Sequence, residues 1–465
     1  MRFEKGRLTA ADIAAAMGGR VTGGSDATPI SGFAIDSRRV QPGDLFFAIV
    51  AARDGHDFVA DAAAAGAAGV VVARPVAGWP AGGPVVIEVP ETIRALQDLG
   101  RAVRRASGAR VVAITGSAGK TTTKEAAAEM LSARYRVVRN HGNLNNHLGL
   151  PLSLLELRHG ADVAVMELGM NHAGEIRVLV GVAEPEVRVW TNVGDAHIGH
   201  FGSADAIAEA KAEIMDGARP TDLLVANADD PRIMARVPRF AGRVATFGTA
   251  EGATVRATSI EDRGLAGTAA DLETPVGRAR LTVPLLGRGH LSNVLAAVTV
   301  AVHMDVPLDA AVERAARLAP APGRGAVVRL ASGVTLIDDT YNSSPSALGR
   351  MLEMLATTPG RRVAVLGEML ELGDGSVALH EACGRAAARA GLAVLVTIGG
   401  APAEALAAAA MEAGMPAGTV RWVATSEEAA ALVPDLVRAG DVVLVKGSHS
   451  VRTEVVARRL RGERG

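Results

Sequence analysis

The chain contains a single cysteine, Cys383, among its 465 residues. One cysteine excludes an intrachain disulfide and any zinc site built mainly from cysteines. A protein without disulfides fits a reducing compartment. We therefore expect a cytoplasmic protein.

Aromatic side chains are also scarce, at 3% of the chain, and the formal net charge is only −1. So few aromatic residues argue against a surface that stacks the bases of a nucleic acid. A near-neutral chain also lacks the basic footprint that binds DNA or an anionic membrane. We expect no nucleic-acid partner.

Long apolar runs are missing as well. Gly399, Gly400 and Pro402 interrupt the most apolar region, residues 392–415, whereas a membrane-spanning helix needs roughly 20 predominantly apolar residues. Asp12 interrupts the N-terminal stretch, which is typical of an amphipathic helix rather than of a signal peptide. The sequence predicts a soluble protein without stable membrane insertion.

The length of the chain indicates two or three domains, because 465 residues are too many for one hydrophobic core. Residues 1–105 combine short strands with alanine-rich helices, and residues 106–322 alternate parallel-type strands with helices. Within the second block, residues 253–286 alternate in polarity and are expected to form an antiparallel extension. The Pro/Gly-dense stretch "APAPGRG" marks a boundary, and residues 323–465 form a second doubly wound unit. The predicted fold class is α/β.

Short, continuously apolar runs are typical of parallel strands that are covered on both faces. Ligands of such sheets bind beyond the carboxyl ends of the strands, so the residues directly after each run are candidates for a site. The expected strands are residues 44–49, 69–72, 85–89, 111–115, 163–167, 187–193, 223–227, 335–338, 363–367, 393–398 and 442–446.

One stretch combines a buried strand, a tight turn and a helix: "VVAITGSAGKTTTKEAAAEML", residues 111–131. Its "GKT" at 119–121 matches the end of the phosphate-binding pattern G-x-x-x-x-G-K-[ST], but Ile114 stands where the first glycine belongs. Gly116 is the other glycine of the turn and indicates a shorter loop. A plain strand–turn–helix with an incidental lysine is the alternative interpretation.

Such a loop has the groups that a phosphate requires. Backbone N–H groups of the turn and the dipole of the following helix attract the anion. Lys120 can reach the terminal phosphates, and the Thr121 hydroxyl can bind Mg²⁺. The sequence predicts a nucleotide-phosphate site here.

Other polar residues follow strands or lie in helices. Glu167 closes an expected strand, where a carboxylate is either a Mg²⁺ ligand or a capping or ion-paired group. Asp195, His197 and His200 follow another strand, but no further His or Cys completes a zinc site. Lys211 lies in an expected helix, and its spacing alone favours a solvated surface lysine.

Several stretches together resemble the Mur ligases, the ATP-dependent amino-acid and peptide ligases of peptidoglycan synthesis. They are "GSAGKTTTKE", "NLNNHLGLPLSLL", "MELGMNHAGEI", "TNVGDAHIGHFGS", "AKAEI", "LIDDTYNSSP" and "VLVKGSHSVRTE". The resemblance covers nearly the whole chain. It implies an N-terminal UDP-substrate-binding domain at residues 1–105, a central ATP-binding domain at 106–322 and a C-terminal Rossmann-like domain at 323–465.

The resemblance also implies an activity. Within the family, the quoted stretches are most similar to the ligase that adds D-alanyl-D-alanine to UDP-N-acetylmuramoyl-tripeptide through an acyl phosphate. ATP and Mg²⁺ would be the cofactors, and a monomer is expected.

Family positions carried over to this chain imply four groups of site residues. The catalytic group comprises Lys120, Lys211, His197 and Arg324. The ATP group comprises Thr115, Gly116, Ser117, Ala118, Gly119, Lys120, Thr121, Thr122, Asn293, Arg324 and Asp339. The Mg²⁺ group comprises Thr121, Glu167, His197 and Lys211, the lysine being carbamylated in the family. The substrate group comprises Ser37, Arg38, Asn145, Asn146, Tyr341 and Asn342.

Three other functions compete with this interpretation. A diamino-acid-adding Mur ligase carries an Asp-Asn-Pro-Arg motif in its last domain, whereas "ADDPR" at 228–232 lies in the central block. A folate ligase shares the ATP core but fits the first block poorly. A P-loop regulatory ATPase would hydrolyse ATP without joining an acceptor.

Overall fold

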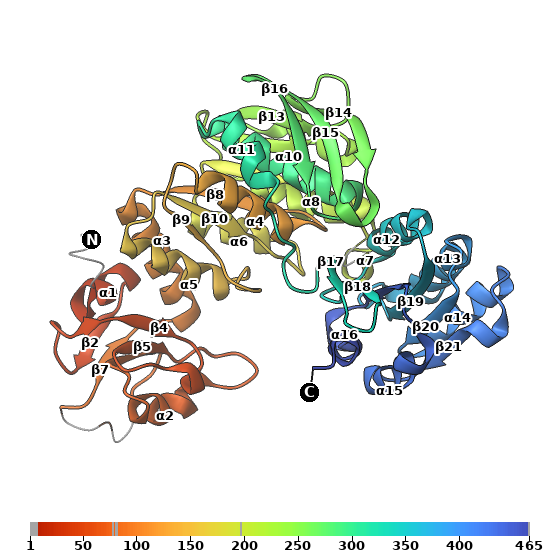
Figure 1. Cartoon of the computed structure of the whole chain (residues 1–465). Helices are drawn as coiled ribbons and strands as arrows, with labels where there is room; N and C mark the ends of the chain where they lie inside the picture. Colours follow the sequence, from red (N-terminus) through yellow and green to blue (C-terminus); the bar gives the residue numbers. More distant parts are fainter. Residues whose placement is uncertain (1–7, 77–78, 80–81, 196–197, 464–465) are drawn as a thin grey trace.

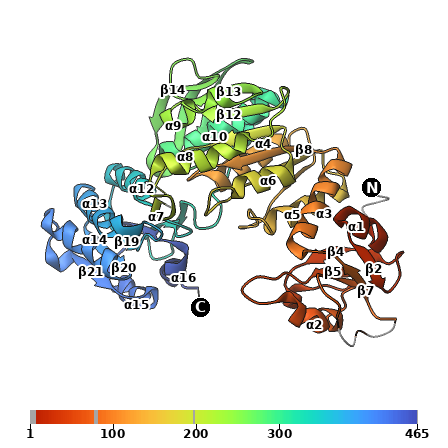
Figure 2. The same ribbon diagram turned by 180° about the vertical axis from the view of Figure 1, so that it is seen from behind.

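The computed structural model describes residues 8–76, 79, 82–195 and 198–463. Three sheets of five, nine and six strands follow one another along the chain, beside a two-stranded pair. Figures 1 and 2 show the first and third sheets at opposite ends of the molecule, with the nine-stranded sheet between them. Over the described residues, no helix has the length and apolar character that crossing a bilayer requires. The α/β class is confirmed.

The N-terminal part is a sheet in the order β2-β7-β6-β5-β4, in which only the β2–β7 pair is antiparallel. The expected amphipathic helix is α1, whose capping box joins Thr9 and Asp12. The elements are β1 (Leu8–Thr9), α1 (Ala10–Met17), β2 (Arg20–Gly23), β3 (Pro29–Ile30), β4 (Gly32–Ala34), η1 (Ser37–Arg39), β5 (Asp44–Phe47), η2 (Gly55–Phe58), α2 (Val59–Ala64), β6 (Gly69–Val72), β7 (Val85–Glu88) and α3 (Thr92–Ser107).

The central sheet has the order β16-β15-β14-β13-β12-β11-β8-β10-β9. Its strands are parallel from β9 to β14, and β14, β15 and β16 form the expected antiparallel extension. Its main elements are β8 (Arg110–Thr115), α4 (Lys120–Leu131), β9 (Val137–Arg139), α5 (Gly149–Leu155), β10 (Val163–Glu167), α6 (Glu175–Ala183), β11 (Val187–Trp190), α7 (Ile198–Phe201), α8 (Ala204–Ala212), β12 (Leu223–Asn227), α9 (Pro231–Met234), β13 (Arg243–Gly248), β14 (Val255–Asp262), β15 (Thr268–Thr274), β16 (Gly277–Val283), α10 (Gly287–His303) and α11 (Leu308–Ala315).

Helices cover both faces of this sheet, which is why its parallel strands are apolar throughout. Buried side chains of α4, α10 and α11 form one core cluster with one face. Those of α3, α5, α6 and α8 pack on the other face in a cluster that continues into α1 and the N-terminal sheet. The N-terminal and central parts therefore share one apolar core.

The C-terminal sheet has the order β17-β18-β22-β19-β20-β21, with only β17 antiparallel to its neighbour. Helices α12, α13 and α14 contribute to the core on one face, and α15 and α16 to the core on the other. Its main elements are β17 (Ala326–Arg329), β18 (Thr335–Asp339), α12 (Pro345–Thr357), β19 (Arg361–Gly367), η7 (Gly373–Gly375), α13 (Ser376–Arg389), β20 (Val394–Ile398), α14 (Ala401–Glu412), β21 (Val420–Val423), α15 (Ser426–Leu436), β22 (Asp441–Lys446) and α16 (Glu454–Arg461).

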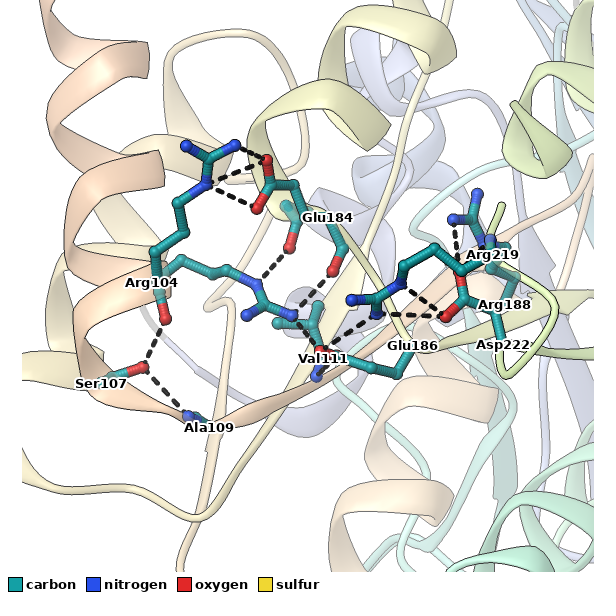
Figure 3. Close-up of polar contacts among 11 residues, drawn as sticks. Arg104, Ser107, Ala109, Val111, Glu184, Glu186, Arg188, Arg219 and Asp222 are labelled. Carbon is teal, nitrogen blue, oxygen red and sulfur yellow. Dashed lines mark hydrogen bonds and ion pairs between the residues drawn. The ribbon is translucent and has the colours of Figure 1, made fainter. Parts of the chain in front are cut away.

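A buried arginine anchors α3, the last helix of the N-terminal part, on the central sheet (Figure 3). Arg104 donates from Nε to Ala183 O at 2.9 Å and from Nη2 to Glu184 O at 2.7 Å. These carbonyls lie at the C-terminal end of α6, where a cation is favourable. Arg104 also pairs with Glu186, which accepts a hydrogen bond from Val111 N at 2.8 Å. The position of α3 is thus fixed by charge as well as by apolar packing.

All of the expected strands are present, with some ends shifted. The largest difference is in the run at 187–193, because β11 already ends at Trp190. Of the three residues that follow, Thr191 and Asn192 hydrogen-bond a neighbouring loop, and Val193 N donates to Asp230 Oδ2 at 2.7 Å. The sequence interpretation missed β9, at the edge of the sheet, and β13, which lies between β12 and β14.

Candidate active site

The phosphate-binding loop lies between β8 and α4. Gly116 and Gly119 have φ values of +153° and +80°, which L side chains rarely adopt. A Cβ on Gly116 would lie 1.9 Å from Thr191 Oγ1, and one on Gly119 would lie 2.0 Å from Asn293 Oδ1. Both positions therefore require glycine. The turn spans residues 116–119, so the shorter loop expected from the sequence is the one observed.

The two residues directly after β11 hold this loop in shape. Ser117 N donates to Asn192 O at 3.0 Å, and Ala118 N donates to Asn192 Oδ1 at 2.9 Å. Ala118 O accepts from Asn192 Nδ2 at 2.9 Å and from Thr191 Oγ1 at 2.8 Å. Sequence reasoning missed both residues, because it extended the strand through them. Their place after an apolar run was the signal that could have found them.

Lys120, the first residue of α4, folds back over the loop. Its Nζ donates to Gly116 O at 2.8 Å. Burial lowers the pKa of Lys120, the nearby charge of Glu167 raises it, and that of Arg324 lowers it. Thus the lysine of the central sheet lies within electrostatic reach of an arginine from the chain segment leading into the C-terminal sheet.

Thr121 and Glu167 meet next to the loop. Thr121 Oγ1 donates to Glu167 Oε2 at 2.8 Å, and Asn145 Nδ2 donates to Glu167 Oε1 at 2.9 Å. This arrangement presents hydroxyl and carboxylate oxygens, the ligand types that Mg²⁺ prefers. Among the described residues, no group of three or more His, Cys, Asp or Glu side chains could hold a metal. A cation here would need further oxygens from phosphate, water or a modified residue.

A buried asparagine that the sequence interpretation did not include positions Glu167. Asn140, 1% exposed, accepts from Glu167 N at 3.0 Å and donates to Glu167 O at 3.0 Å and to Leu144 O at 2.9 Å. Lys124 Nζ in turn donates to Asn140 O at 2.7 Å. This clamp aligns the end of β10 with the loop that carries Asn145. No local pattern signals it, because the partners are distant in sequence.

Lys211 is deeply buried in α8, with 1% of its surface exposed. The interpretation from spacing alone, a solvated helix lysine, is therefore wrong. Burial lowers the pKa of Lys211 well below its usual value, and the positive charge of Lys120 lowers it further. Within the described part of the chain, no ion pair with a carboxylate compensates this amine. A neutral or chemically modified amine suits such a position better than a cation does.

His197, which the sequence implicates in metal binding, lies outside the described residues. Its neighbour Ile198 begins α7, and Ile198 N donates to Asp195 O at 3.2 Å. His200, for which no role was predicted, contacts His172 edge-to-face with ring centroids 5.7 Å apart.

Three side chains form a stack at the start of the C-terminal sheet. The guanidinium of Arg324 lies 4.0 Å from the ring centroid of Tyr341, and the Tyr341 ring stacks on His449 at 5.6 Å. A cation over an aromatic face is a favourable arrangement. The sequence interpretation placed Arg324 and Tyr341 in the site but on different ligands, and it did not include His449.

Asp339 ends β18 and pairs with a buried lysine. Lys446 Nζ donates to Asp339 Oδ2 at 2.7 Å and to Asn342 O at 2.7 Å. The sequence interpretation did not include Lys446 among the site residues, although it ends β22 just as Asp339 ends β18. Burial lowers the pKa of His290 in α10, and the charges of Asp339 and Lys446 also act on it. We infer that the pair lies near this helix.

Asn293 and His290 lie on α10. Asn293 is buried against Gly119 of the phosphate loop, so it is not a helix-interior group remote from the site. His290 Nδ1 hydrogen-bonds Leu286 O at 2.7 Å within the helix. The first turns of α10 therefore face both the phosphate loop and the C-terminal part.

The remaining predicted residues occupy two other places. Arg38, in η1 with Ser37, is bound to Asp36, with Nη2–Oδ2 at 2.7 Å. Hydrogen bonds from Arg38 lower the pKa of Asp36 to about 2. Asn146 Oδ1 accepts from Gly149 N at 2.9 Å at the start of α5. The structure does not join Ser37 and Arg38 to the phosphate loop, since they belong to the N-terminal sheet region.

Three family models match the chain. The model described as Mur ligase family, catalytic domain, matches residues 29–141. The Mur ligase middle domain matches residues 114–301, and the Mur ligase, glutamate ligase domain, matches residues 323–449. Together they span the phosphate loop and the segments from both sides of the site.

Similar proteins with Mur ligase names match this chain over most of their length. A relative from Escherichia coli (strain K12), named UDP-N-acetylmuramoyl-tripeptide--D-alanyl-D-alanine ligase, is 36% identical and covers 81% of this chain and 82% of its own. A crystal structure of MurF from Acinetobacter baumannii has a TM-score of 0.89 at 32% identity, over 100% of both chains. MurF ligase from Thermotoga maritima in complex with ADP has a TM-score of 0.81 at 31% identity, over 93% of this chain and 97% of its own. The motifs, the fold and these similarities agree, and the chain belongs to the Mur ligase family.

Proposed function

We propose that this chain is an ATP-dependent ligase that joins D-alanyl-D-alanine to UDP-N-acetylmuramoyl-tripeptide in the synthesis of peptidoglycan precursors. One observation carries the proposal: the glycine turn at 116–119, Lys120 and the Thr121–Glu167 pair form a phosphate and cation site that faces Asn293 of α10. Arg324, at the entry to the C-terminal sheet, also contributes to the electrostatics of this loop, because its charge acts on the pKa of Lys120. The relatives named above, similar over most of the chain, support the same reaction.

The site fits ATP. Gly116 and Gly119 leave the loop backbone open to phosphates, and residues Thr115 to Thr122 connect the strand to the first turn of α4. We assign Asn293 to the adenine and Asp339 to the ribose. Asn293 has a donor and an acceptor for the edge of a base, and its contact with the phosphate loop supports this assignment.

The oxygens of Thr121 and Glu167 fit Mg²⁺, a hard cation with a preference for oxygen ligands. When bound, Mg²⁺ would neutralise charge on the phosphates. Asn145 and Asn140 orient the carboxylate toward the loop. We assign Lys211, as a carbamate, and His197 to the same metal region. Carbamylation would replace a buried cation by an anion with two oxygens, and the burial of Lys211 supports it.

The reaction needs an activated carboxylate, because a carboxylate oxygen is a poor leaving group. A carboxylate oxygen of the tripeptide attacks the γ-phosphorus of ATP, and the bond to the ADP oxygen breaks. The amine of D-alanyl-D-alanine then attacks the carbonyl carbon of the acyl phosphate, phosphate departs, and the amine loses a proton. Lys120 and Arg324 hold the charge of the transferred phosphoryl group in place throughout.

We assign the UDP end of one substrate and the dipeptide to residues in different parts of the chain. We assign the pyrophosphate of UDP to Ser37 and Arg38, since arginine suits bidentate phosphate recognition. Arg38 would have to exchange its partner Asp36 for the phosphate. The other assigned substrate residues are Asn145 and Asn146 near the phosphate loop and Tyr341 and Asn342 near the dipeptide.

We further propose a cytoplasmic monomer, because its substrates are nucleotides and a dipeptide. The domains would be residues 1–105, 106–322 and 323–465. The diamino-acid-adding ligase and the non-ligating ATPase are not favoured, since the Escherichia coli relative above 30% identity carries the name of a D-alanyl-D-alanine ligase.

ADP release with alternative acceptors tests the proposed function. With ATP, Mg²⁺ and UDP-N-acetylmuramoyl-tripeptide, we expect ADP to form when D-alanyl-D-alanine is added and not with a diamino acid or glutamate. A coupled assay of ADP, with each acceptor and without any, measures this. ADP formation that is independent of every acceptor would indicate a regulatory ATPase instead.

We expect the domains to close on the substrates. ATP must contact Lys120 and Glu167 as well as Arg324 and Asp339, and many enzymes assemble such sites by closing. Small-angle scattering should show a smaller radius of gyration with an ATP analogue and the UDP-tripeptide than for the free protein. The Pro/Gly-rich segment 319–325 is the predicted hinge. An unchanged radius would exclude an open resting state.

Arg324→Ala should separate the rate of acyl-phosphate formation from the binding of the UDP-tripeptide. It should slow acyl-phosphate formation strongly while leaving the affinity for the UDP-tripeptide nearly unchanged. The nucleotide end of that substrate is assigned to the N-terminal part, which Arg324 does not contact. Equal losses of both would mean that the arginine supports the fold.

A further inference from the structure

A short segment connects the phosphate loop with the C-terminal part. Asn192 hydrogen-bonds Ser117 and Ala118, and Gly194 N donates to Ser117 Oγ at 2.9 Å. The same glycine faces α12: a Cβ on it would lie 3.5 Å from Ser346 Oγ and 3.6 Å from Ser117 Cβ. A displacement of the segment from Asn192 to Gly194 would therefore disturb the phosphate loop on one side and the C-terminal part on the other.

A few residues farther on, α7 meets the loop that leads into η7, backbone against backbone. Gly199 N donates to Glu371 O at 3.0 Å. A Cβ on Gly199 would lie 2.5 Å from Gly373 N and 2.8 Å from Glu371 O, closer than real Cβ contacts. The adjacent Ile198 packs against the core shared by the N-terminal and central parts and also against a core of the C-terminal sheet. Helix α7 thus bridges two cores through a contact that admits only glycine.

The C-terminal side of this contact is held firmly. Met369 N donates to the Nε2 atom of the buried His380 at 2.9 Å. Ser448 joins the same loop to the end of β22, because Leu370 N donates to Ser448 Oγ at 2.9 Å and Ser448 N donates to Glu368 O at 3.2 Å. Two residues before Ser448, Lys446 holds Asp339.

The N-terminal part is anchored separately. Its helix α3 is fixed on the central sheet by Arg104 (Figure 3) and by the shared apolar core. A disturbance at α7 should therefore shift the C-terminal part relative to the phosphate loop, and leave the UDP-binding part where it is.

We propose that Gly199 is a positioning residue: its side-chain-free contact with Glu371 and Gly373 sets the spacing between the phosphate loop and the C-terminal sheet. In the domain arrangement of this structure, the contact determines how far Arg324 and Asp339 lie from Lys120. This role rests on the proposed ligase function, because it matters only if both parts act on one nucleotide.

Gly199→Ala tests the proposal with little other disturbance. Alanine is a better helix former than glycine, and Gly199 lies within α7 without a positive φ. The matched control is Gly181→Ala in α6, where an added Cβ has nothing within 4 Å. Gly373→Ala is less suitable, since its φ of +63° would add backbone strain.

Steady-state kinetics should show an effect on kcat without an effect on the KM for UDP-tripeptide. We expect Gly199→Ala to lower kcat for ADP release about 10- to 100-fold, since displacements of about 1 Å can cost that much. The KM for UDP-tripeptide should stay within about twofold of the wild-type value, and Gly181→Ala should behave as wild type. Ile198→Ala, which removes the apolar bridge without a clash, should change kcat in the same direction.

Hydrogen exchange of the free protein gives a readout that does not depend on turnover. We expect faster exchange at residues 198–202 and 371–375 in Gly199→Ala, and no change at α3. A wild type without acceptor-dependent ADP release would sink the proposed function, while the exchange result still reports on the contact. A Gly199→Ala enzyme with normal kcat, or with unchanged exchange in both segments, would overturn the positioning role. So would a loss of kcat matched by an equal loss of UDP-tripeptide affinity.

Discussion

Lys120→Ala is expected to abolish ligation while the protein stays folded. The lysine donates to Gly116 O in the loop where the phosphates of a nucleotide would be held, and the charges of Glu167 and Arg324 both act on its pKa. Removing one preorganised donor from such a site typically costs about 100- to 1000-fold in kcat, and we expect a loss of about 1000-fold or more.

The fold should tolerate this substitution. Burial lowers the pKa of Lys120, which means that the folded protein disfavours its charged form. Removing the ammonium therefore takes away no large stabilising charge. Thermal unfolding and circular dichroism should match the wild type while ADP release is lost. Lys120→Arg is the control for charge alone, and it should also be poorly active because a planar guanidinium differs in shape from an ammonium. Near-normal turnover of folded Lys120→Ala would refute the assignment of the loop.

Lys211→Ala should have very low activity that short carboxylic acids partly restore. Lys211 is 1% exposed, and its pKa is lowered well below the usual value by burial and by Lys120. The neutral amine, which reacts with CO₂, is thus favoured at lower pH than for a solvated lysine. Its Nζ forms a bond to the carbon of CO₂ and loses a proton, which leaves a carbamate with two oxygens.

Losing these oxygens should reduce kcat roughly 100-fold, the upper end of what removing a partner from a metal site costs. Acetate or formate can enter the space of the missing side chain, and added acid should raise the rate of Lys211→Ala several-fold. Depletion of CO₂ should slow the wild type and leave the variant unchanged. Lys120→Ala is the matched control, because it lacks an ammonium rather than a carbamate and should not respond to the acids. A fully active Lys211→Ala enzyme would show that the lysine plays no part in the reaction.

For the unmodified amine of Lys211, before CO₂ adds to it, the pH dependence of stability has a definite sign. Because its pKa in the folded protein is depressed, the folded state is favoured at high pH, where the amine is neutral in both states. This contribution is lost as the pH falls from the unfolded pKa through the folded pKa. Replacement by alanine therefore removes a group whose burial as a cation is unfavourable at neutral pH.

Features that depend on neighbouring residues could be predicted from the amino-acid sequence alone. Continuous apolar runs identified the parallel strands, since such strands are buried on both faces. The spacing of Gly116, Gly119, Lys120 and Thr121 identified the phosphate loop and its helix, because glycine is needed where the backbone turns and approaches other groups closely. The alternating stretch at 253–286 identified the antiparallel extension.

Features that depend on distant residues could be seen only in the folded chain. The helix pattern around Lys211 does not reveal which elements cover it, so spacing alone favoured a solvated side chain that is in fact buried. Asn140 and Asn192 look like ordinary loop residues until β10 and the phosphate loop are placed beside them. Gly199 lies in a short helix where glycine has no local purpose. Its need for glycine arises only because the backbone of the Gly373 loop packs against it. Local sequence patterns report on a strand or helix itself, whereas burial, hydrogen-bond partners and steric fit depend on what the rest of the chain packs against it.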